Sequence, residues 1–341
     1  MLNFCTLFDS NYIDKGMVLY QSLINNCENF SLYILPMDDK CSSILQSLNF
    51  DCATVMDFND FLVPELAAVK KTRGKGEFCW TCTPFLVDYC LKKYNLEMVT
   101  YLDSDLCFYS NPTVLTSEMI SAGDEVQIIR HNFIKGERDA LVRVSGEYCV
   151  QFNTFLNSPK SLEVLESWKN DCLNDCGYSS DGESLGDQKY LNKWPEKYDV
   201  INISNNLGAG VAPWNTKRFR IKENDQQKYI LKDRETGTEW PLIFFHFQNL
   251  VQLEERVFDS NCYVNKAQKK VFYNLYKNYV ECLLNQRKML KDRFGLEIMI
   301  KVHPVLGEKQ NKNSNLWKQV KDFIYYMKSL GFLYTKIVIK E

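Results

Sequence analysis

The stretch YLDSDLCFYSNP carries two aspartates, Asp103 and Asp105, separated by one residue and placed directly after an apolar run. The preceding segment, MVTYL, is short and contains β-branched and aromatic residues, which predicts a short buried strand. Alternate side chains of a strand share a face, so we expect both carboxylates to point at the same object. Two adjacent anions repel each other, and a divalent cation relieves that repulsion. The pair therefore predicts a metal site.

The composition restricts the class of protein. A chain of 341 residues with ordinary apolar and charged content is long enough for one large α/β domain with an appendage, or for two domains. The formal net charge of −2 argues against a general nucleic-acid binder. The sequence contains no apolar run of membrane-spanning length and does not begin like a signal peptide, so we expect a cytoplasmic protein.

The cysteine content also bears on the compartment in which the protein works. There are thirteen, and only CWTC (79–82) has the CxxC spacing. A thioredoxin-like redox motif is one interpretation of that tetrapeptide. The favoured interpretation is that the cysteines are reduced thiols in the core of a cytoplasmic protein.

The first part of the chain alternates between strand and helix patterns. Strands are predicted at 2–9, 30–38, 52–58 and 98–102, and helices at 14–25, 40–49, 58–66 and 83–94. The basic, glycine-containing segment 70–78 is predicted to be a loop. Such alternation predicts a mostly parallel sheet with helices on both faces.

The pattern is less regular after residue 120. Strands are expected at 126–133, 148–157 and 199–204, helices at 160–173 and 187–194, and a hairpin around ETGT whose second arm ends in a histidine. From about residue 266 the chain reads as helical and basic, with sixteen Lys and Arg against six Asp and Glu. We therefore divide the chain into a catalytic domain, 1–262, with halves 1–112 and 113–262, and a basic helical region, 263–341.

Several segments, taken in order, resemble glycosyltransferases of the GT-A fold, and family 8 with its bacterial relatives in particular. They are FCTLFDSNY, WTCTPFLVDYCL, LDSD, FNTFLN, GDQKYLN, GAGVAPWN and FFHFQ, which together span residues 2–248. The resemblance implies a Rossmann-like α/β fold that binds a nucleotide-diphosphate sugar.

By this resemblance, Asp105 and Asp103 bind the metal, Asp103 also contacts the ribose of the donor, and His246 is the third protein ligand. Imidazole beside carboxylates favours Mn²⁺, with Mg²⁺ as the alternative. Two plainer interpretations remain open at this point. The aspartates can simply end a strand, and His246 can be a core histidine.

The resemblance also suggests which residues contact the donor. The turn after the first strand resembles the base-binding loop of the family, and ligands of open α/β sheets bind beyond the carboxyl ends of strands. A lysine of the basic loop is placed to meet phosphate, and the glycine-rich segment LGAGVAPWN can bring backbone amides close to the ligand; a solvated lysine and a plain turn are the alternatives. The residues expected to bind the donor are Thr6, Asp9, Tyr12, Lys75, Asp103, Gly208 and Gly210.

Asn153, Asp187 and Gln188 match the polar residues that surround the transferred sugar in the family, and we expect them to be catalytic. Helix capping is the alternative for Asp187 and Gln188. Phe155 stands where family members usually have glycine, so we expect it to reshape the floor of the sugar pocket.

The implied reaction is metal-dependent transfer of a hexose or N-acetylhexosamine from a UDP-sugar, with retention of configuration, to a glycan or lipid-linked glycan of a bacterial surface polysaccharide. Two other functions stay open: a haloacid-dehalogenase-type phosphatase that uses the DSD motif, and a non-catalytic sugar-nucleotide-binding protein. The basic C-terminal region either lies on the inner face of an anionic membrane or packs on the catalytic domain.

Overall fold

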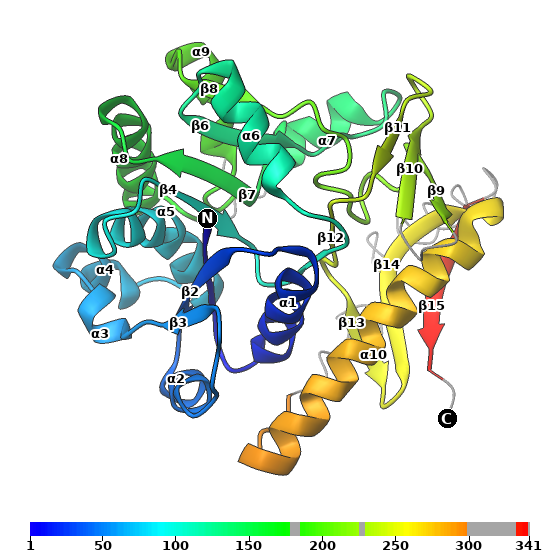
Figure 1. The fold of residues 1–341 in the computed structure, drawn as a ribbon, viewed down its shortest axis with the longest axis horizontal. Helices are drawn as coiled ribbons and strands as arrows, with labels where there is room; N and C mark the ends of the chain where they lie inside the picture. Colours follow the sequence, from blue (N-terminus) through cyan, green and yellow to red (C-terminus); the bar gives the residue numbers. More distant parts are fainter. Residues whose placement is uncertain (178–184, 225–228, 299–331, 340–341) are drawn as a thin grey trace, which may run out of the picture.

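A seven-stranded sheet forms the centre of the molecule, in the order β3-β2-β1-β4-β7-β6-β8 (Figure 1). The structure is a computed structural model that describes residues 1–177, 185–224, 229–298 and 332–339. Within this sheet only β7 runs antiparallel to its neighbours. The strands are β1 (Leu2–Phe8), β2 (Phe30–Pro36), β3 (Ala53–Val55), β4 (Met98–Leu102), β6 (Val126–Arg130), β7 (Tyr148–Leu156) and β8 (Ile201–Ile203). The predicted fold class, α/β with a mostly parallel central sheet, is confirmed.

Helices cover both faces of this sheet, because alternate residues of its strands enter two separate cores. Cys5 and Leu7 of β1 belong to one core, whereas Phe4 and Phe8 belong to the other. The helices are α1 (Ile13–Asn26), α2 (Asp39–Gln46), α3 (Phe58–Phe61), α4 (Pro64–Lys70), α5 (Lys75–Lys93), α6 (Thr113–Ala122), α7 (Arg138–Ser145), α8 (Pro159–Asn174), α9 (Trp194–Lys197) and α10 (Lys269–Phe294).

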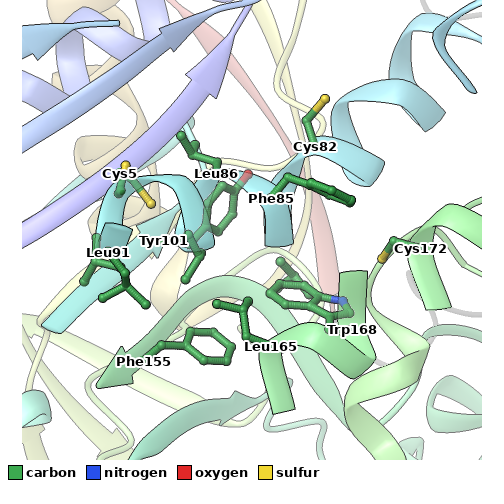
Figure 2. Close-up of a cluster of buried hydrophobic side chains, with 14 of the residues drawn as sticks. Cys5, Cys82, Phe85, Leu86, Leu91, Tyr101, Phe155, Leu165, Trp168 and Cys172 are labelled. Atoms are coloured by element: carbon green, nitrogen blue, oxygen red, sulfur yellow. The ribbon is translucent and has the colours of Figure 1, made fainter. Parts of the chain in front are cut away.

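Figure 2 shows part of the core between the sheet and helices α5 and α8. Trp168 of α8 is fully buried and stacks on Phe155 of β7, with ring centroids 6.0 Å apart. Phe155 was expected at the floor of the sugar pocket, and that expectation is wrong. Its ring points into the core, where burying a side chain of this size stabilises the fold by about 1.5–3 kcal/mol.

The predicted hairpin around ETGT is confirmed as β10 (Tyr229–Asp233) and β11 (Glu239–Pro241). β9 (Phe219–Glu223) extends this small sheet. The second arm does not continue to the histidine as one strand: the Leu242 N–H still donates to the carbonyl oxygen of Tyr229 at 2.9 Å, but the Ile243 N–H donates to that of Gly208 at 2.8 Å. The chain instead leaves the hairpin and forms β12 (Phe244–His246), which pairs with β5 (Leu106–Phe108).

The C-terminal region is helical only in part. Helix α10 is present as predicted, but Phe332–Val338 forms strand β15, in keeping with its aromatic and β-branched residues. β15 pairs with β14 (Val257–Asn265), which also pairs with β13 (Val251–Glu254). The expected domain division at 262/263 stays a prediction, and it falls inside β14.

Helix α10 runs beside α1 (Figure 1) and buries its aromatic side chains in the protein. Tyr279 stacks on Phe247 with ring centroids 3.7 Å apart, and Tyr276 packs edge-on against the same ring. These contacts favour the interpretation in which the aromatics of α10 pack on the catalytic domain. Trp317, another aromatic residue of the basic C-terminal region, lies outside the described residues. None of the described helices is long and apolar enough to cross a membrane.

Candidate active site

A pocket of about 690 Å³ opens beyond the carboxyl ends of β1 and β4. Its walls come from segments that are far apart in the sequence: the turn after β1, the first half of α5, the turn after β4, the segment at Asp187 and the end of β12. This position agrees with the general rule that open α/β sheets bind ligands at the carboxyl ends of their strands.

Asp103 and Asp105 occupy the turn between β4 and β5 rather than a strand. The backbone N–H of Leu106 donates to the carbonyl oxygen of Asp103 at 3.3 Å, which closes the turn. The two carboxylates therefore lie just past the end of β4 and converge as expected, but they do so because the chain turns and not through strand alternation. Both residues line the pocket.

The pairing of β12 with β5 brings His246 to this turn, because His246 lies opposite Leu106 in the ladder. Its Nε2 atom is 2.9 Å from Oδ1 of Asp105 and 3.8 Å from Oδ2 of Asp103. One ligand atom from each of the three side chains lies within 4.8 Å of the other two. The three predicted metal ligands are thus brought together.

The orientation of the His246 ring is set by a second contact. Its Nδ1 lies 3.0 Å from Oε1 of Gln151, an oxygen that can only accept, so Nδ1–H donates and Nε2 faces the aspartates. Trp214 packs edge-on against the ring at 5.3 Å. Metal-binding histidines commonly donate their second N–H in this way.

The protonation states of Asp103, Asp105 and His246 depend on one another. Burial raises the pKa of Asp103, and the neighbouring Asp105 adds to this, although His246 opposes it. Burial alone would also raise the pKa of Asp105, but His246 and Lys15 more than offset it and hold that pKa below the ordinary value. Burial disfavours the imidazolium, yet the Asp105 carboxylate raises the pKa of His246. The site is therefore built around one carboxylate that stays ionised.

These residues fit a divalent cation. Two ligands at right angles on a cation with bonds of about 2.1 Å lie about 3 Å apart. The 2.9 Å between Nε2 of His246 and Oδ1 of Asp105 matches that separation. Two carboxylates and one imidazole suit Mn²⁺ well and also admit Mg²⁺.

Asp187 and Gln188 also line the pocket. The backbone oxygen of Asp187 accepts a hydrogen bond from Nε1 of Trp168 at 2.9 Å, and Nε2 of Gln188 donates to the backbone oxygen of Ser145 at 2.6 Å. Burial, reinforced by the charge of Asp103, raises the pKa of the Asp187 carboxyl to about 8. Asp187 is thus a buried acid that faces the same cavity as the metal triad.

The expected donor-binding turn reaches the pocket in part. Asp9 and Tyr12 line it, and the Asp9 carboxylate accepts from the backbone and side chain of Asn11, each at 3.0 Å. Lys75 lines it as well, but as the first residue of α5 rather than in a loop. The helix begins there because the Glu77 carboxylate accepts from the Gly74 N–H at 2.9 Å.

Four predicted site residues do not line the pocket: Thr6, Asn153, Gly208 and Gly210. Thr6 and Asn153 are fully buried, and neither the Thr6 hydroxyl nor the Asn153 amide has a hydrogen-bond partner among the described residues. An unpaired buried polar group costs about 1–3 kcal/mol, so these two side chains reduce the stability of the fold.

The two glycines stand where a side chain would clash with neighbouring parts of the protein. A Cβ at Gly208 would lie 2.1 Å from the backbone oxygen of Pro241. Gly210 has φ +75°, and a Cβ there would lie 2.8 Å from Nε2 of Gln151, the residue that orients His246. Their predicted contact with the donor stays a prediction.

Sequence reasoning missed several residues of the site. Gln151 and Trp214 position His246, and Lys15 lies 3.5 Å from Asp105. Trp80 is 37% exposed and lines the pocket as well. Gln151 carried one usable signal, since it lies two residues before Asn153 and so on the same face of β7.

The CWTC motif lies within α5 and lacks the properties of a redox pair. Burial, together with the charges of Asp9 and Asp187, raises the pKa of Cys79 to about 12. Burial raises the pKa of Cys82 as well. Reactive thiols need the opposite shift. Cys82 is a buried core thiol, whereas Cys79 is half-buried and lines the pocket.

Comparisons with known proteins found relatives but no matching family model. "Uncharacterized protein YfnD" of Bacillus subtilis (strain 168) is 27% identical over 281 residues, which cover 82% of this chain and 87% of that protein. "Uncharacterized protein YfnF" of the same strain is 29% identical over 251 residues, covering 72% of this chain and 80% of that protein.

The chain is also similar to solved structures. One is mouse xyloside xylosyltransferase 1 in its apo form, with 15% identity, a TM-score of 0.44 and coverage of 73% of this chain and 98% of that one. Another is the galactosyltransferase LgtC in complex with donor and acceptor sugar analogs, with 14% identity, a TM-score of 0.48 and coverage of 73% and 87%. The solved structures named here are glycosyltransferases, the class of protein that the sequence motifs resemble.

Proposed function

We propose that this protein is a metal-dependent, retaining glycosyltransferase of the GT-A type that moves a hexose or N-acetylhexosamine from a UDP-sugar to a glycan. The observation that carries the proposal is the convergence of Asp103, Asp105 and His246 at one side of a pocket that also holds Asp187 and Gln188. The pocket thus combines a set of cation ligands with a buried acid at the end of an α/β sheet.

The metal side would bind the diphosphate. Asp103, Asp105 and His246 would hold Mn²⁺ or Mg²⁺, which supplies Lewis-acid neutralisation of the leaving diphosphate when bound. Asp9 and Tyr12 lie where the β1 turn would meet the base and ribose, and Lys75 lies where α5 begins. The N-terminus of a helix favours an anion, which supports a phosphate contact there.

The part of the pocket at Asp187 and Gln188 would bind the sugar. Asp187 and Gln188 would lie near the anomeric carbon and stabilise the positive charge that develops there as the sugar–phosphate bond breaks. The acceptor hydroxyl attacks from the face that the diphosphate leaves, so the configuration is retained without a covalent intermediate on the protein. The acceptor we propose is a glycan or lipid-linked glycan of a bacterial surface polysaccharide, as the sequence resemblance implies.

A melting-shift screen tests this proposal. UDP-glucose, UDP-galactose and their N-acetyl derivatives are compared with and without Mn²⁺, with GDP-mannose as the control nucleotide sugar. A donor present at 100 times its Kd stabilises the fold by about 2.7 kcal/mol. We expect a Mn²⁺-dependent shift with one UDP-sugar, followed by an α-configured product in NMR. No shift with any UDP-sugar, or an inverted product, contradicts the proposal.

A further inference from the structure

Lys15, in the first turn of α1, is directed at the metal side of the pocket. Its Nζ lies 3.5 Å from Oδ2 of Asp105, and its side chain is only 11% exposed. The ammonium also lies over the ring of Tyr12, 4.2 Å from the centroid. Tyr12 and Asp105 line the pocket, whereas Lys15 lies behind them.

The first turn of α1 is held in place from two sides. Asp14 is fully buried, and its Oδ2 accepts from Nε of Arg287 in α10 at 2.6 Å. Gly16 packs so closely on Phe8 that a Cβ there would lie 2.4 Å from the ring. Lys15 lies between these two anchored residues, so the backbone from which it reaches Asp105 is held firmly.

Asp105 therefore has a neighbour at each oxygen: Nε2 of His246 at Oδ1 and the ammonium of Lys15 at Oδ2. With both aspartates ionised and the imidazole neutral, Asp103, Asp105 and Lys15 carry a net charge of −1. A divalent cation makes this set +1, an excess that an anionic diphosphate can neutralise. Without Lys15 the same cation would leave the set neutral.

We propose that Lys15 makes cation binding and diphosphate binding depend on each other. It repels the cation while the pocket holds no nucleotide, and its charge attracts the diphosphate once the cation is present. Coupling of this kind is reciprocal, so each ligand raises the affinity of the other by the same factor. The inference rests on the proposed function, since it takes a nucleoside diphosphate as the anion. Lys15 acts through its charge and not by contact with the reacting atoms.

The test is a titration of Mn²⁺ in which the free ion is measured by electron paramagnetic resonance, with and without UDP. Lys15→Met keeps most of the side-chain length and removes the charge. We expect it to bind Mn²⁺ alone about tenfold more tightly, because a unit charge this close repels a divalent ion even at the dielectric constant of water. We also expect it to reduce the factor by which UDP tightens Mn²⁺ binding.

Two variants serve as controls. Lys40→Met removes one positive charge from the exposed face of α2 and should bind Mn²⁺ as the unaltered protein does. Lys15→Arg keeps the charge and should restore most of the coupling. Melting curves of the metal-free variants show whether α1 is disturbed.

The outcomes separate this inference from the proposed function. If Lys15→Met binds Mn²⁺ alone no more tightly than the unaltered protein, or UDP still tightens Mn²⁺ binding by an unchanged factor, the role of Lys15 is wrong. If the unaltered protein binds neither Mn²⁺ nor UDP, the proposed function itself fails.

Discussion

Two buried carboxyl groups of the pocket, those of Asp105 and Asp187, have pKa values shifted in opposite directions. On the metal side, His246 and Lys15 hold the pKa of Asp105 below its ordinary value, so this group remains an anion. On the sugar side, burial and the charge of Asp103 raise the pKa of Asp187 to about 8, and no cation is among the groups that shift it within the described residues. Among the described residues, Asp105 thus has positive partners that lower its pKa, whereas none is among the groups that shift the pKa of Asp187.

This difference fits the chemistry that each side would meet. A carboxylate that is to bind a cation must be ionised, and His246 and Lys15 keep Asp105 in that form. The partner that Asp187 lacks would be the positive charge that develops on the sugar, which exists only in the transition state. The comparison predicts that the two acids affect different kinetic steps.

The largest effect is expected from Asp105→Asn. The amide keeps the size of the side chain but removes the charge on which the cation depends. Lewis-acid stabilisation is worth several kcal/mol, so we expect transfer to fall about a thousandfold or more, together with Mn²⁺-dependent binding of UDP. Initial rates and calorimetric UDP titrations check this. Activity within tenfold of the unaltered protein would refute the metal mechanism.

His246→Ala should weaken Mn²⁺ binding about a hundredfold, because it removes one of three protein ligands and the group that Gln151 orients. The melting temperature of the metal-free protein should change much less than the metal affinity. Titration with Mn²⁺ and a melting curve in EDTA give the two values. A large loss of stability with unchanged affinity would make His246 a core histidine.

Asp187→Asn tests the part of the pocket that we propose binds the sugar. We expect kcat, measured above pH 8 where this carboxyl is ionised, to fall about a hundredfold while Mn²⁺-dependent UDP binding stays near its original strength. The reason is that the Asp187 carboxylate would meet a positive charge only in the transition state. Asp39→Asn, at an exposed position of α2, is the matched control. An equal loss of UDP affinity would place Asp187 in ground-state binding instead.

The smallest effect concerns pH. In the metal-free protein the pKa of Asp187 is raised to about 8, so the folded state holds a proton that the unfolded state has released. Its stabilising contribution is complete below the unfolded pKa of about 3.9 and is lost as the pH rises toward 8. The melting temperature should therefore fall more between pH 5 and about 8 in the unaltered protein than in Asp187→Asn. Parallel curves in EDTA would contradict the raised pKa.

The order of elements around the site was predictable from the sequence. The apolar run before Asp103 predicted a buried strand, which is β4, and the alternation before it predicted the parallel half of the sheet. Patterns of this kind are local, because the spacing of the apolar residues within a strand or helix indicates which of its faces is buried. The pair of aspartates also predicted a cation site, and this prediction did not depend on knowing which residues surround the pair in the fold.

The turn around the aspartates and the irregular course after Pro241 were harder to predict. The DSD segment follows a strand pattern, yet the chain turns at Asp103 and starts the short strand β5. Helix α5 likewise begins at Lys75 inside a basic segment, because Glu77 caps it. Polar residues at element boundaries are compatible with several backbone paths, and tertiary contacts choose among them.

From the sequence alone, two neighbouring carboxylates, a late histidine and the acid of the GDQ segment could be named as candidates. Only the tertiary structure decided how they act, because charge and burial depend on neighbours that are distant in the chain. The β12–β5 ladder places His246 against Asp105, Gln151 turns its ring, and Lys15 reaches the same carboxylate from α1. Asp187 gains its raised pKa from burial, which no local pattern of residues records.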